Sequence, residues 1–391
     1  MARESPHTSQ VSARWEFAGC VLMRNLTTSA VILLGMAAAL AAQTQPPAPS
    51  QSQPPAAISQ APPPPTQPHP SAPAEYNCEP VNPDATPEAR ALLKTLCAVS
   101  GKGILSGQHN YPNQRDLDTE RVHAITGRYP AIWGSDFGFT GDEDKDSILH
   151  RDLMIAEAKK QAAAGSIIYL CWHMLRPTED EPGEPGVSWR NSVQARLTDD
   201  QWAELITPDT PLHKRWEKYM DTAAGYLQQL QEAHIPVLWR PMHENNGGFF
   251  WWGGRPGMGG TAQLYREVYA RMVYVHHLNN LLWVWNQNGP APVGEFFNYF
   301  PGRQYVDVVS YDNYRELGDT YYYQMLALAQ GKPIALGEVG APPSAEVLEA
   351  QPRWTWFMVW AGMVNDAILP AYNTPYVLKR GDPIRGTQPP Q

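Results

Sequence analysis

The sequence has few cysteines and no excess of positive charge, and both absences exclude classes of protein. Four cysteines among 391 residues are too few for the disulfide scaffold of a small secreted domain. Lys and Arg total 30 against 39 Asp and Glu, so the chain lacks the electrostatic footprint of a nucleic-acid or anionic-membrane binder. We therefore expect neither nucleic acid nor a membrane surface as a partner.

A membrane-spanning run is also missing near the N-terminus. The apolar run at residues 30–40 is shorter than the ~20 residues that cross a bilayer. It follows Arg24 and ends in small residues at A-x-A spacing, which is typical of a cleaved signal peptide. We expect residues 1–42 to be an N-terminal extension and signal peptide, with the true start at Met23. The protein would then be secreted or periplasmic, and an anchor helix is the alternative.

Residues 43–75 carry no charged side chain before Glu75 and contain twelve of the 38 prolines. Such a segment cannot bury apolar surface and favours extended polyproline II structure. We interpret it as a linker, with a ligand for a proline-binding domain as the alternative. The folded domain is then expected at residues 76–391.

The cysteines suggest one covalent link in this domain. Cys78 and Cys97 lie nineteen residues apart at its start, and an oxidising compartment favours a disulfide between them. Cys171 lies in an apolar run and is expected to be a buried, inert thiol.

A glycine-rich dinucleotide fingerprint is absent after the first apolar run, and the rest of the pattern favours a different α/β fold. Eight short apolar runs alternate with amphipathic, helix-like stretches, and near-continuous hydrophobicity indicates parallel strands covered on both faces. Eight repeats over some 300 residues predict a single (β/α)8 TIM barrel. The expected strands are residues 103–109, 130–137, 166–173, 235–244, 280–286, 306–314, 333–338 and 356–360.

Polar and aromatic residues end nearly every expected strand. In a TIM barrel, the chemistry collects at the carboxyl ends of the strands, so these residues predict an active-site rim or a sugar-binding cleft. They are His109, Asp136, Trp172, His173, His243, Glu244, Trp285, Asn286, Asp312, Tyr314, Glu338 and Trp360.

Two glutamates in this set have the arrangement that glycoside hydrolysis requires. Glu244 ends the fourth expected strand and Glu338 ends the seventh. A retaining enzyme needs one carboxylic acid to protonate the leaving oxygen and one carboxylate to attack the anomeric carbon. Arg240 and Tyr314 are the nearest hydrogen-bond donors for the nucleophile. A single glutamate at a strand end more often pairs with an arginine, but two together favour catalysis.

The run WRPMHENNGGFFWWG, with GEVG some ninety residues later, resembles glycoside hydrolase family 26, the β-mannanases of clan A. Four shorter motifs support the resemblance: SGQHN at the first expected strand, CWH at the third, SYDNY at the sixth and FMVWAG at the eighth. The resemblance covers residues 101–378. Family 26 has His before the acid/base glutamate where other clan members have Asn, and His243 matches family 26.

The resemblance implies a role for each matching residue. Glu244 would be the acid/base and Glu338 the nucleophile of a retaining endo-1,4-β-mannanase. The enzyme would act on mannan, galactomannan or glucomannan. We expect it to be a monomer that needs no metal or cofactor. The sugar being cleaved would lie in a pocket lined by His173, Arg240 and His243, on a stacking platform, Trp360. In the D-x-Y motif, Tyr314 would orient the nucleophile and Asp312 would contact the sugar or its active-site partners. Phe249 replaces the tryptophan of many relatives, so that the aromatic contact on the leaving-group side is smaller.

Several alternatives remain open on the sequence alone. Family relatives act on β-1,3-xylan or mixed-linkage β-glucan, or release mannobiose from chain ends, and a non-catalytic carbohydrate-binding barrel is a further possibility. His109, His173 and His243 are also potential metal ligands. The long segment 174–207, which contains Trp189, would shape distal subsites or be a plain surface excursion.

Overall fold

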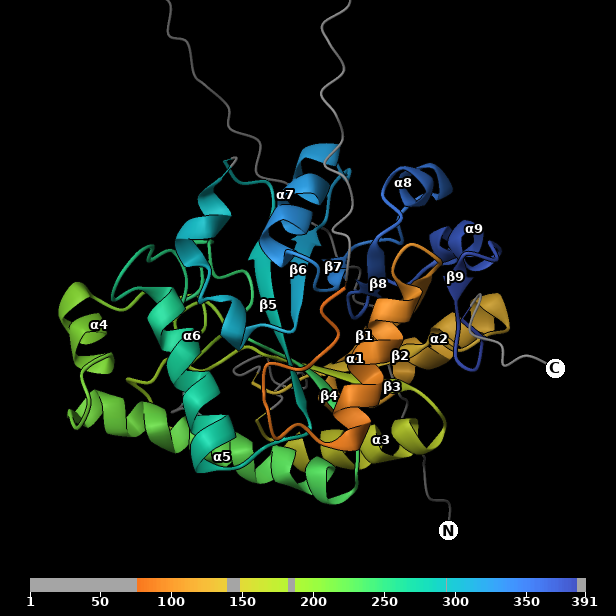
Figure 1. Cartoon of the computed structure of the whole chain (residues 1–391). Helices are drawn as coiled ribbons and strands as arrows, with labels where there is room; N and C mark the ends of the chain where they lie inside the picture. The colour runs from red at the N-terminus through yellow and green to blue at the C-terminus, as the bar shows by residue number, and fades with distance from the viewer. Residues whose placement is uncertain (1–75, 139–147, 182–186, 293, 385–391) are drawn as a thin grey trace, which may run out of the picture. The chain divides into compact units, whose positions relative to one another are not determined.

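The computed structural model describes residues 76–138, 148–181, 187–292 and 294–384, and their fold is a closed barrel of eight parallel strands (Figure 1). Strands β1 to β8 pair in chain order, and the ring closes because β1 pairs with both β8 and β2. A ninth short strand adds to the outside of β1. The strands are β1 (Ile104–Asn110), β2 (Ile132–Asp136), β3 (Ile167–Trp172), β4 (Val237–Pro241), β5 (Leu281–Asn288), β6 (Val308–Asn313), β7 (Ile334–Val339), β8 (Trp354–Val359) and β9 (Val377–Leu378).

Helices follow the strands and cover the outside of the barrel. Several begin at residues with strong start signals: Thr86, Thr198, Thr210 and Ser344 each accept a hydrogen bond from a backbone N–H of the first turn. The helices are α1 (Pro87–Val99), α2 (Leu117–Thr126), α3 (Arg151–Ala163), α4 (Asp199–Leu205), α5 (Pro211–Glu232), α6 (Thr261–Ala270), α7 (Asp319–Ala329), α8 (Ala345–Ala350) and α9 (Leu369–Tyr372), with a π-helical turn (Arg271–Val275) after α6.

All eight predicted strands are present, so the predicted (β/α)8 class is confirmed. Their bounds differ most at the fourth, which was expected to run to Glu244 but ends at Pro241. The reason is local, because Met242 and Glu244 have positive φ values of 51° and 49°, which a strand cannot contain. The eighth strand starts two residues earlier than expected, at Trp354.

Helix α1, which precedes the first strand, was not predicted. Its buried leucines share one hydrophobic cluster with inward-facing residues of strands on several sides of the ring, among them Leu238, Leu282 and Ala335. The helix therefore closes the end of the barrel at which the strands start, and Figure 1 shows it in orange in front of the strands. Its start, Thr86-Pro87-Glu88, is a recognisable helix signal.

The cysteine predictions are confirmed. Cys78 and Cys97 form a disulfide that attaches the N-terminal arm to α1, and Cys171 is a buried free thiol. Six tryptophans are buried: Trp251, Trp252, Trp283, Trp285, Trp354 and Trp356. Trp285, predicted at the rim, is thus part of the core. The predicted signal peptide and linker lie outside the described residues. Among the helices that the structure describes, none is long and apolar enough to cross a membrane.

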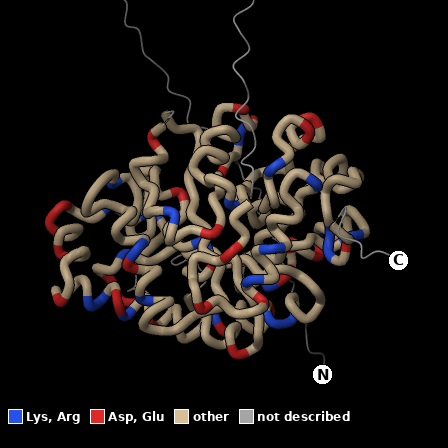
Figure 2. The backbone as a smooth tube through the Cα atoms, in the orientation of Figure 1, with Lys and Arg blue, Asp and Glu red and all other residues tan. Residues whose placement is uncertain are grey.

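Charged residues of both signs alternate over the described surface, and Figure 2 shows neither sign gathered on one part of it. This distribution agrees with the mild net charge of −9.

The closing role of α1 predicts a large stability loss on truncating one of its buried leucines. Leu96 is fully buried, so Leu96→Ala should lower the free energy of unfolding by about 2–5 kcal/mol through lost burial and a cavity. Lys94→Ala on the exposed side of the same helix is the control and should cost little. Guanidinium unfolding followed by tryptophan fluorescence measures both. Equal, small losses would contradict the closing role.

Candidate active site

Three strands bring one arginine and two carboxylates together inside the carboxyl end of the barrel. Arg240 of β4 donates from Nη1 to Asp312 Oδ2 of β6 at 2.5 Å, and from Nη2 to Glu338 Oε1 of β7. Arg240 and Asp312 are fully buried and Glu338 almost so. Burial disfavours the charge on Arg240, but Asp312 and Glu338 more than offset this, and the guanidinium pKa is raised well above its ordinary value. One cation thus serves two carboxyl groups.

The second oxygen of Glu338 has its own donor. The hydroxyl of Tyr314, just after β6, donates to Glu338 Oε2 at 2.6 Å. Burial and the charge of Glu338 raise the pKa of Tyr314, so the phenol keeps its proton and remains a donor. Each Glu338 oxygen therefore accepts a hydrogen bond, and one of them comes from a cation, which suits an ionised carboxylate.

The backbone conformation at Glu244 fixes the direction of its side chain. Both Met242 and Glu244 have left-handed φ values, a conformation that costs about 1–3 kcal/mol for each such residue unless neighbours enforce it. Asn286 of β5 enforces it by accepting the Glu244 N–H at 2.7 Å, and Trp252 donates to the carbonyl of His243 at 2.8 Å. The turn thereby points the Glu244 side chain at the other carboxyl groups.

The Glu244 carboxyl has surroundings opposite to those of Glu338. It is 8% exposed and receives no hydrogen bond from any residue that the structure describes. Burial, followed by the charges of Asp312 and Glu338, raises its pKa well above the ordinary 4.5. Oxygens of Glu244, Asp312 and Glu338 lie within 4.8 Å of one another, and Arg240 donates to Asp312 and Glu338 but not to Glu244. The proton that this cluster retains belongs on Glu244.

Asp312 is more constrained than its carboxyl neighbours. Burial raises its pKa, while the hydrogen bonds from Arg240 and from the Asn286 side chain, the latter at 2.7 Å, oppose that rise. Asn286 also donates to Ser310 at 2.8 Å. A single asparagine thus fixes both Asp312 and the backbone of Glu244.

Two histidines lie beside this cluster. His173, just after β3, packs its ring edge-on to that of His243, and their Nε2 atoms lie 2.7 Å apart. The other ring nitrogen of His173 bonds to Asp136 at the end of β2. Burial lowers the pKa of His243 well below its ordinary value, and His173 and Arg240 add to this effect. His243 is therefore neutral.

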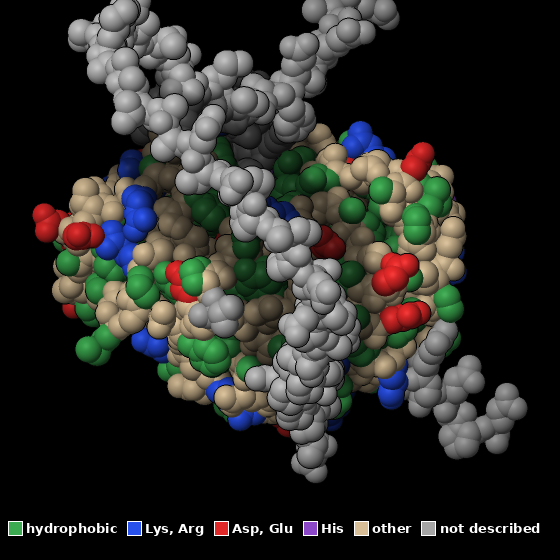
Figure 3. Space-filling model, turned by 90° about the horizontal axis from the view of Figure 1, so that it is seen from above, with side chains coloured by type: hydrophobic (Ala, Val, Ile, Leu, Met, Phe, Trp, Pro, Cys, Tyr) green, Lys and Arg blue, Asp and Glu red, His purple; other side chains and the backbone are tan. Residues whose placement is uncertain are grey.

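Aromatic rings surround the histidines. Trp360, after β8, stacks on His109 with ring centroids 4.0 Å apart and remains partly exposed. Trp189 of the long loop after β3 lies 4.9 Å from His173. Figure 3 views the molecule from above and shows hydrophobic side chains around a hollow in which charged side chains are visible.

The residues present do not favour a metal centre in place of this arrangement. Among the described residues, potential ligands gather closely in two groups, Glu244–Asp312–Glu338 and His109–Asp136–Cys171. Arg240 already donates to two members of the first group and would repel a cation. In the second, the Cys171 thiol already donates to Asp136 at 3.1 Å, and Asp136 also bonds to His173. His109, His173 and His243 do not form such a group.

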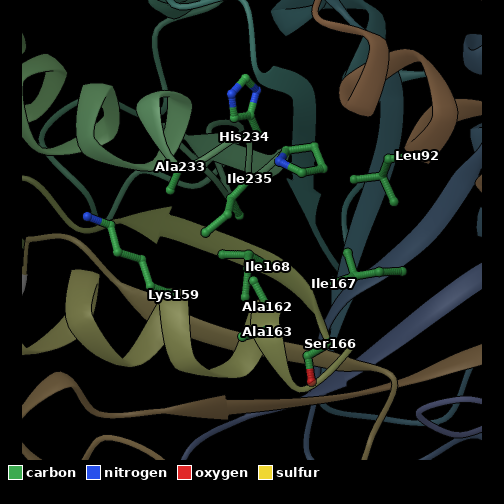
Figure 4. A pocket seen from close by; sticks show the side chains of 11 residues that line it. Leu92, Lys159, Ala162, Ala163, Ser166, Ile167, Ile168, Ala233, His234 and Ile235 are labelled. Atoms are coloured by element: carbon green, nitrogen blue, oxygen red, sulfur yellow. The ribbon is translucent and has the colours of Figure 1, made fainter.

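Cavities lie at both ends of the barrel. One of about 490 Å³ adjoins Tyr314 and is walled by Pro342, Pro343 and Met363. Another, of about 480 Å³, lies where β3 and β4 start, and Figure 4 shows Ile167, Ile168 and other apolar side chains around it. The second is at the end opposite to the carboxylates, so we assign it no part in catalysis.

Comparison with known proteins agrees with this geometry. The family model described as glycosyl hydrolase family 26 matches residues 81–382. The chain belongs to glycosyl hydrolase family 26. The GH26A structure from Muricauda sp. is 38% identical, with a TM-score of 0.71, covering 76% of this chain and 98% of that one. The Podospora anserina GH26-CBM35 β-(1,4)-mannanase is 30% identical, with a TM-score of 0.67, covering 80% of this chain and 70% of that one.

Curated relatives point the same way. A mannan endo-1,4-beta-mannosidase of Thermothelomyces thermophilus is 34% identical over 79% of this chain, and mannan endo-1,4-beta-mannosidase A of a Piromyces species is 30% identical over 72%. The match covers 63% and 45% of those two proteins, which is less than two thirds of the length of either.

Most residues that the family 26 resemblance singled out are together in the structure. Arg240, Asp312, Tyr314 and Glu338 share hydrogen bonds, while Glu244, His173, His243 and Trp360 adjoin them. Phe249 is the outlying member, because its partly exposed ring packs on Phe250, 4.6 Å away, and Phe250 in turn contacts His243.

Two residues of this family 26 site had no firm predicted role. Asn286 was noted only as a strand end, yet it fixes both Asp312 and Glu244. Asp136 was likewise predicted only as the end of a strand. The structure shows a cap, since its carboxylate accepts the backbone N–H groups of Gly138 and His173. Their position at strand ends was the available signal.

The surroundings of Glu244 predict a pH effect that does not depend on activity. Asp312→Asn removes a neighbouring negative charge and should lower the pKa of Glu244, so that its carboxyl loses the proton at lower pH than in the wild type. Carbon-13 NMR of glutamate-labelled protein, assigned by Glu244→Gln, follows this titration. Asp307→Asn, another buried aspartate at the opposite barrel end, should leave it unchanged. A Glu244 pKa that rises or stays constant in Asp312→Asn would contradict the stated effect of the Asp312 charge on Glu244.

Proposed function

We propose that this chain is a retaining endo-1,4-β-mannanase in which Glu244 is the general acid/base and Glu338 the nucleophile. The observation that supports this assignment is the contrast between the surroundings of the two carboxyl groups. Glu338 accepts hydrogen bonds from Arg240 and Tyr314, whereas buried Glu244 accepts none from the described residues and keeps its proton. Opposite environments of this kind mark the acid and the base of a carboxyl pair.

The separation of the two groups favours retention. An oxygen of Glu244 lies within 4.8 Å of one of Glu338. Carboxyl groups about 5–5.5 Å apart act by double displacement, whereas inverting enzymes hold theirs about 6.5–9.5 Å apart to admit water. The short gap leaves room for the anomeric carbon but not for an additional water.

In the first step, Glu338 attacks the anomeric carbon of a mannosyl unit while Glu244 gives its proton to the departing glycosidic oxygen. As Glu338 becomes an ester, it loses negative charge, and the pKa of Glu244 falls because one of its raising neighbours is neutralised. In the second step, Glu244 takes a proton from water, which attacks the same carbon and releases Glu338. Arg240 and Tyr314 stabilise the carboxylate that leaves.

We assign the remaining predicted residues to the site of the cleaved sugar. His173, His243, Asp312 and Trp360 surround the carboxyl pair, and the partly exposed Trp360 suits stacking on a sugar face. Phe249, one layer further out, is the proposed aromatic contact on the leaving-group side.

The substrate assignment rests on the relatives, which are named mannan endo-1,4-beta-mannosidases. We propose β-1,4-mannan, galactomannan or glucomannan as substrate. The proposed location rests on the N-terminal sequence, which has the pattern of a signal peptide and linker. We propose a secreted or periplasmic monomer with residues 76–391 as the catalytic domain.

Product profiles on linear mannan, galactomannan, 1,3-xylan and barley β-glucan test this proposal. We expect a rapid fall in the viscosity of galactomannan solutions with mixed oligosaccharide products. Glu338→Ala should lose on the order of 10⁴-fold or more of the rate and still bind mannan, whereas Glu346→Ala, an exposed glutamate on α8, should keep it. Preferred cleavage of xylan or β-glucan, or release of mannobiose alone, would overturn the substrate assignment.

A further inference from the structure

The backbone pairing between β4 and β5 ends before the turn that carries Glu244. The two strands pair only from Val237 to Trp239, opposite Leu281 to Trp283. Strand β5 nevertheless continues to Asn288, and its last residues pair with β6 on the other side. Within the described strands, the end of β5 therefore has no strand partner on the side of the Glu244 turn.

Side-chain hydrogen bonds take the place of that backbone pairing. Three consecutive residues of the turn bond to three consecutive residues of β5, and the two members of each pair are 42 residues apart in the chain. The pairs are Glu244–Asn286, Asn245–Gln287 and Asn246–Asn288. Because the offset is constant, the end of β5 acts as a template along which the turn lies in register.

The outermost pair is the strongest anchor, because the side chain of Asn246 bonds twice to the backbone of β5. Its Nδ2 donates to the carbonyl of Asn288 at 2.9 Å, and its Oδ1 accepts the N–H of Asn288 at 2.8 Å. A backbone N–H only donates and a carbonyl only accepts, so these two partners fix which amide atom of Asn246 is oxygen and which is nitrogen. The amide thus imitates the backbone of a neighbouring strand.

The Glu244 carboxyl depends on the turn for its position. It receives no hydrogen bond from any residue that the structure describes, and the φ of 49° at Glu244 is a conformation that persists only where its surroundings enforce it. Glu338, in contrast, is held directly by Arg240 and Tyr314. A looser turn would therefore displace Glu244 and leave Glu338 in place.

We propose that Asn246 is a positioning residue for the acid/base: by fixing the turn to Asn288, it holds Glu244 where it can protonate the departing oxygen. The catalytic role of Glu244 rests on the proposed function, whereas the anchoring of its carboxyl does not. Loss of Asn246 should impair proton transfer more than nucleophilic attack. A merely less stable barrel would impair both equally.

Two substrates that differ in their need for an acid test this selectivity. Asn246→Ala should lower kcat/KM on mannooligosaccharides about 10- to 100-fold, because a small misplacement of a catalytic group costs that much. On a dinitrophenyl β-mannobioside, whose leaving group departs without a proton, kcat/KM should fall less than about threefold. The ratio of the two values does not depend on how much of the protein is folded. Equal losses on both substrates, or no loss on either, would overturn the proposal.

Asn280→Ala is the matched control. This buried amide donates to the carbonyl of Ile235 at 2.8 Å and so links the residues just before β4 and β5, at the opposite end of the barrel. Its loss should lower stability without changing the ratio of the two kcat/KM values. If Asn246→Ala does not fold, Asn246→Ser, which has one hydroxyl in place of the two amide groups, takes its place with the same expected loss.

The Glu244 carboxyl provides a readout that needs no substrate. Burial is the main cause of its raised pKa, so a carboxyl that moves towards water should titrate at lower pH. Carbon-13 NMR of glutamate-labelled protein should show this lower pKa in Asn246→Ala and the wild-type value in Asn280→Ala. An unchanged Glu244 pKa in Asn246→Ala would refute the anchoring. If the wild type cleaves neither substrate, the proposed function fails, and this titration still decides the inference.

Discussion

The site depends on one buried guanidinium that is shared between two carboxylates. Arg240 bonds to Asp312 and Glu338 from inside the barrel, where an unpaired charge of any of the three would be strongly destabilising. This sharing gives Glu338 a cationic donor and a fixed orientation. It also leaves no cation for Glu244, the third carboxyl group of the cluster. A single interaction thus distinguishes the proposed nucleophile, Glu338, from the proposed acid, Glu244.

The barrel makes that sharing possible because each participant comes from a different strand. Strands β4, β6 and β7 place Arg240, Asp312 and Glu338 at the same level of the interior, and β5 supplies Asn286 to lock Asp312 and the turn at Glu244. Below this polar layer, the interior is apolar and α1 closes it. The functional groups therefore lie next to a packed apolar layer, and contacts with neighbouring side chains, rather than solvent, set their rotamers.

Much of the fold and of the site was predictable from the sequence, and the features that were missed have physical causes. Eight apolar runs were sufficient for the barrel class. Because parallel strands align their carboxyl ends, the same pattern placed Glu244 and Glu338 near each other, and their catalytic roles stay a prediction. The left-handed turn at Met242 and Glu244 was not predictable, since neither residue is glycine and Asn286, distant in sequence, enforces it. Nor was the contact of Asp136 with the ring of His173, which lies just after the next strand. Helix α1 was missed despite a clear start signal.

The central claim is that Glu338 forms a covalent bond with the sugar while Glu244 does not. A 2-deoxy-2-fluoro mannosyl substrate with a good leaving group should trap that intermediate, because fluorine slows its hydrolysis more than its formation. Peptide mass spectrometry of the trapped protein is expected to locate one glycosyl group on Glu338. A label on Glu244 or Asp312, or turnover to an inverted anomer without any labelled peptide, would contradict the account.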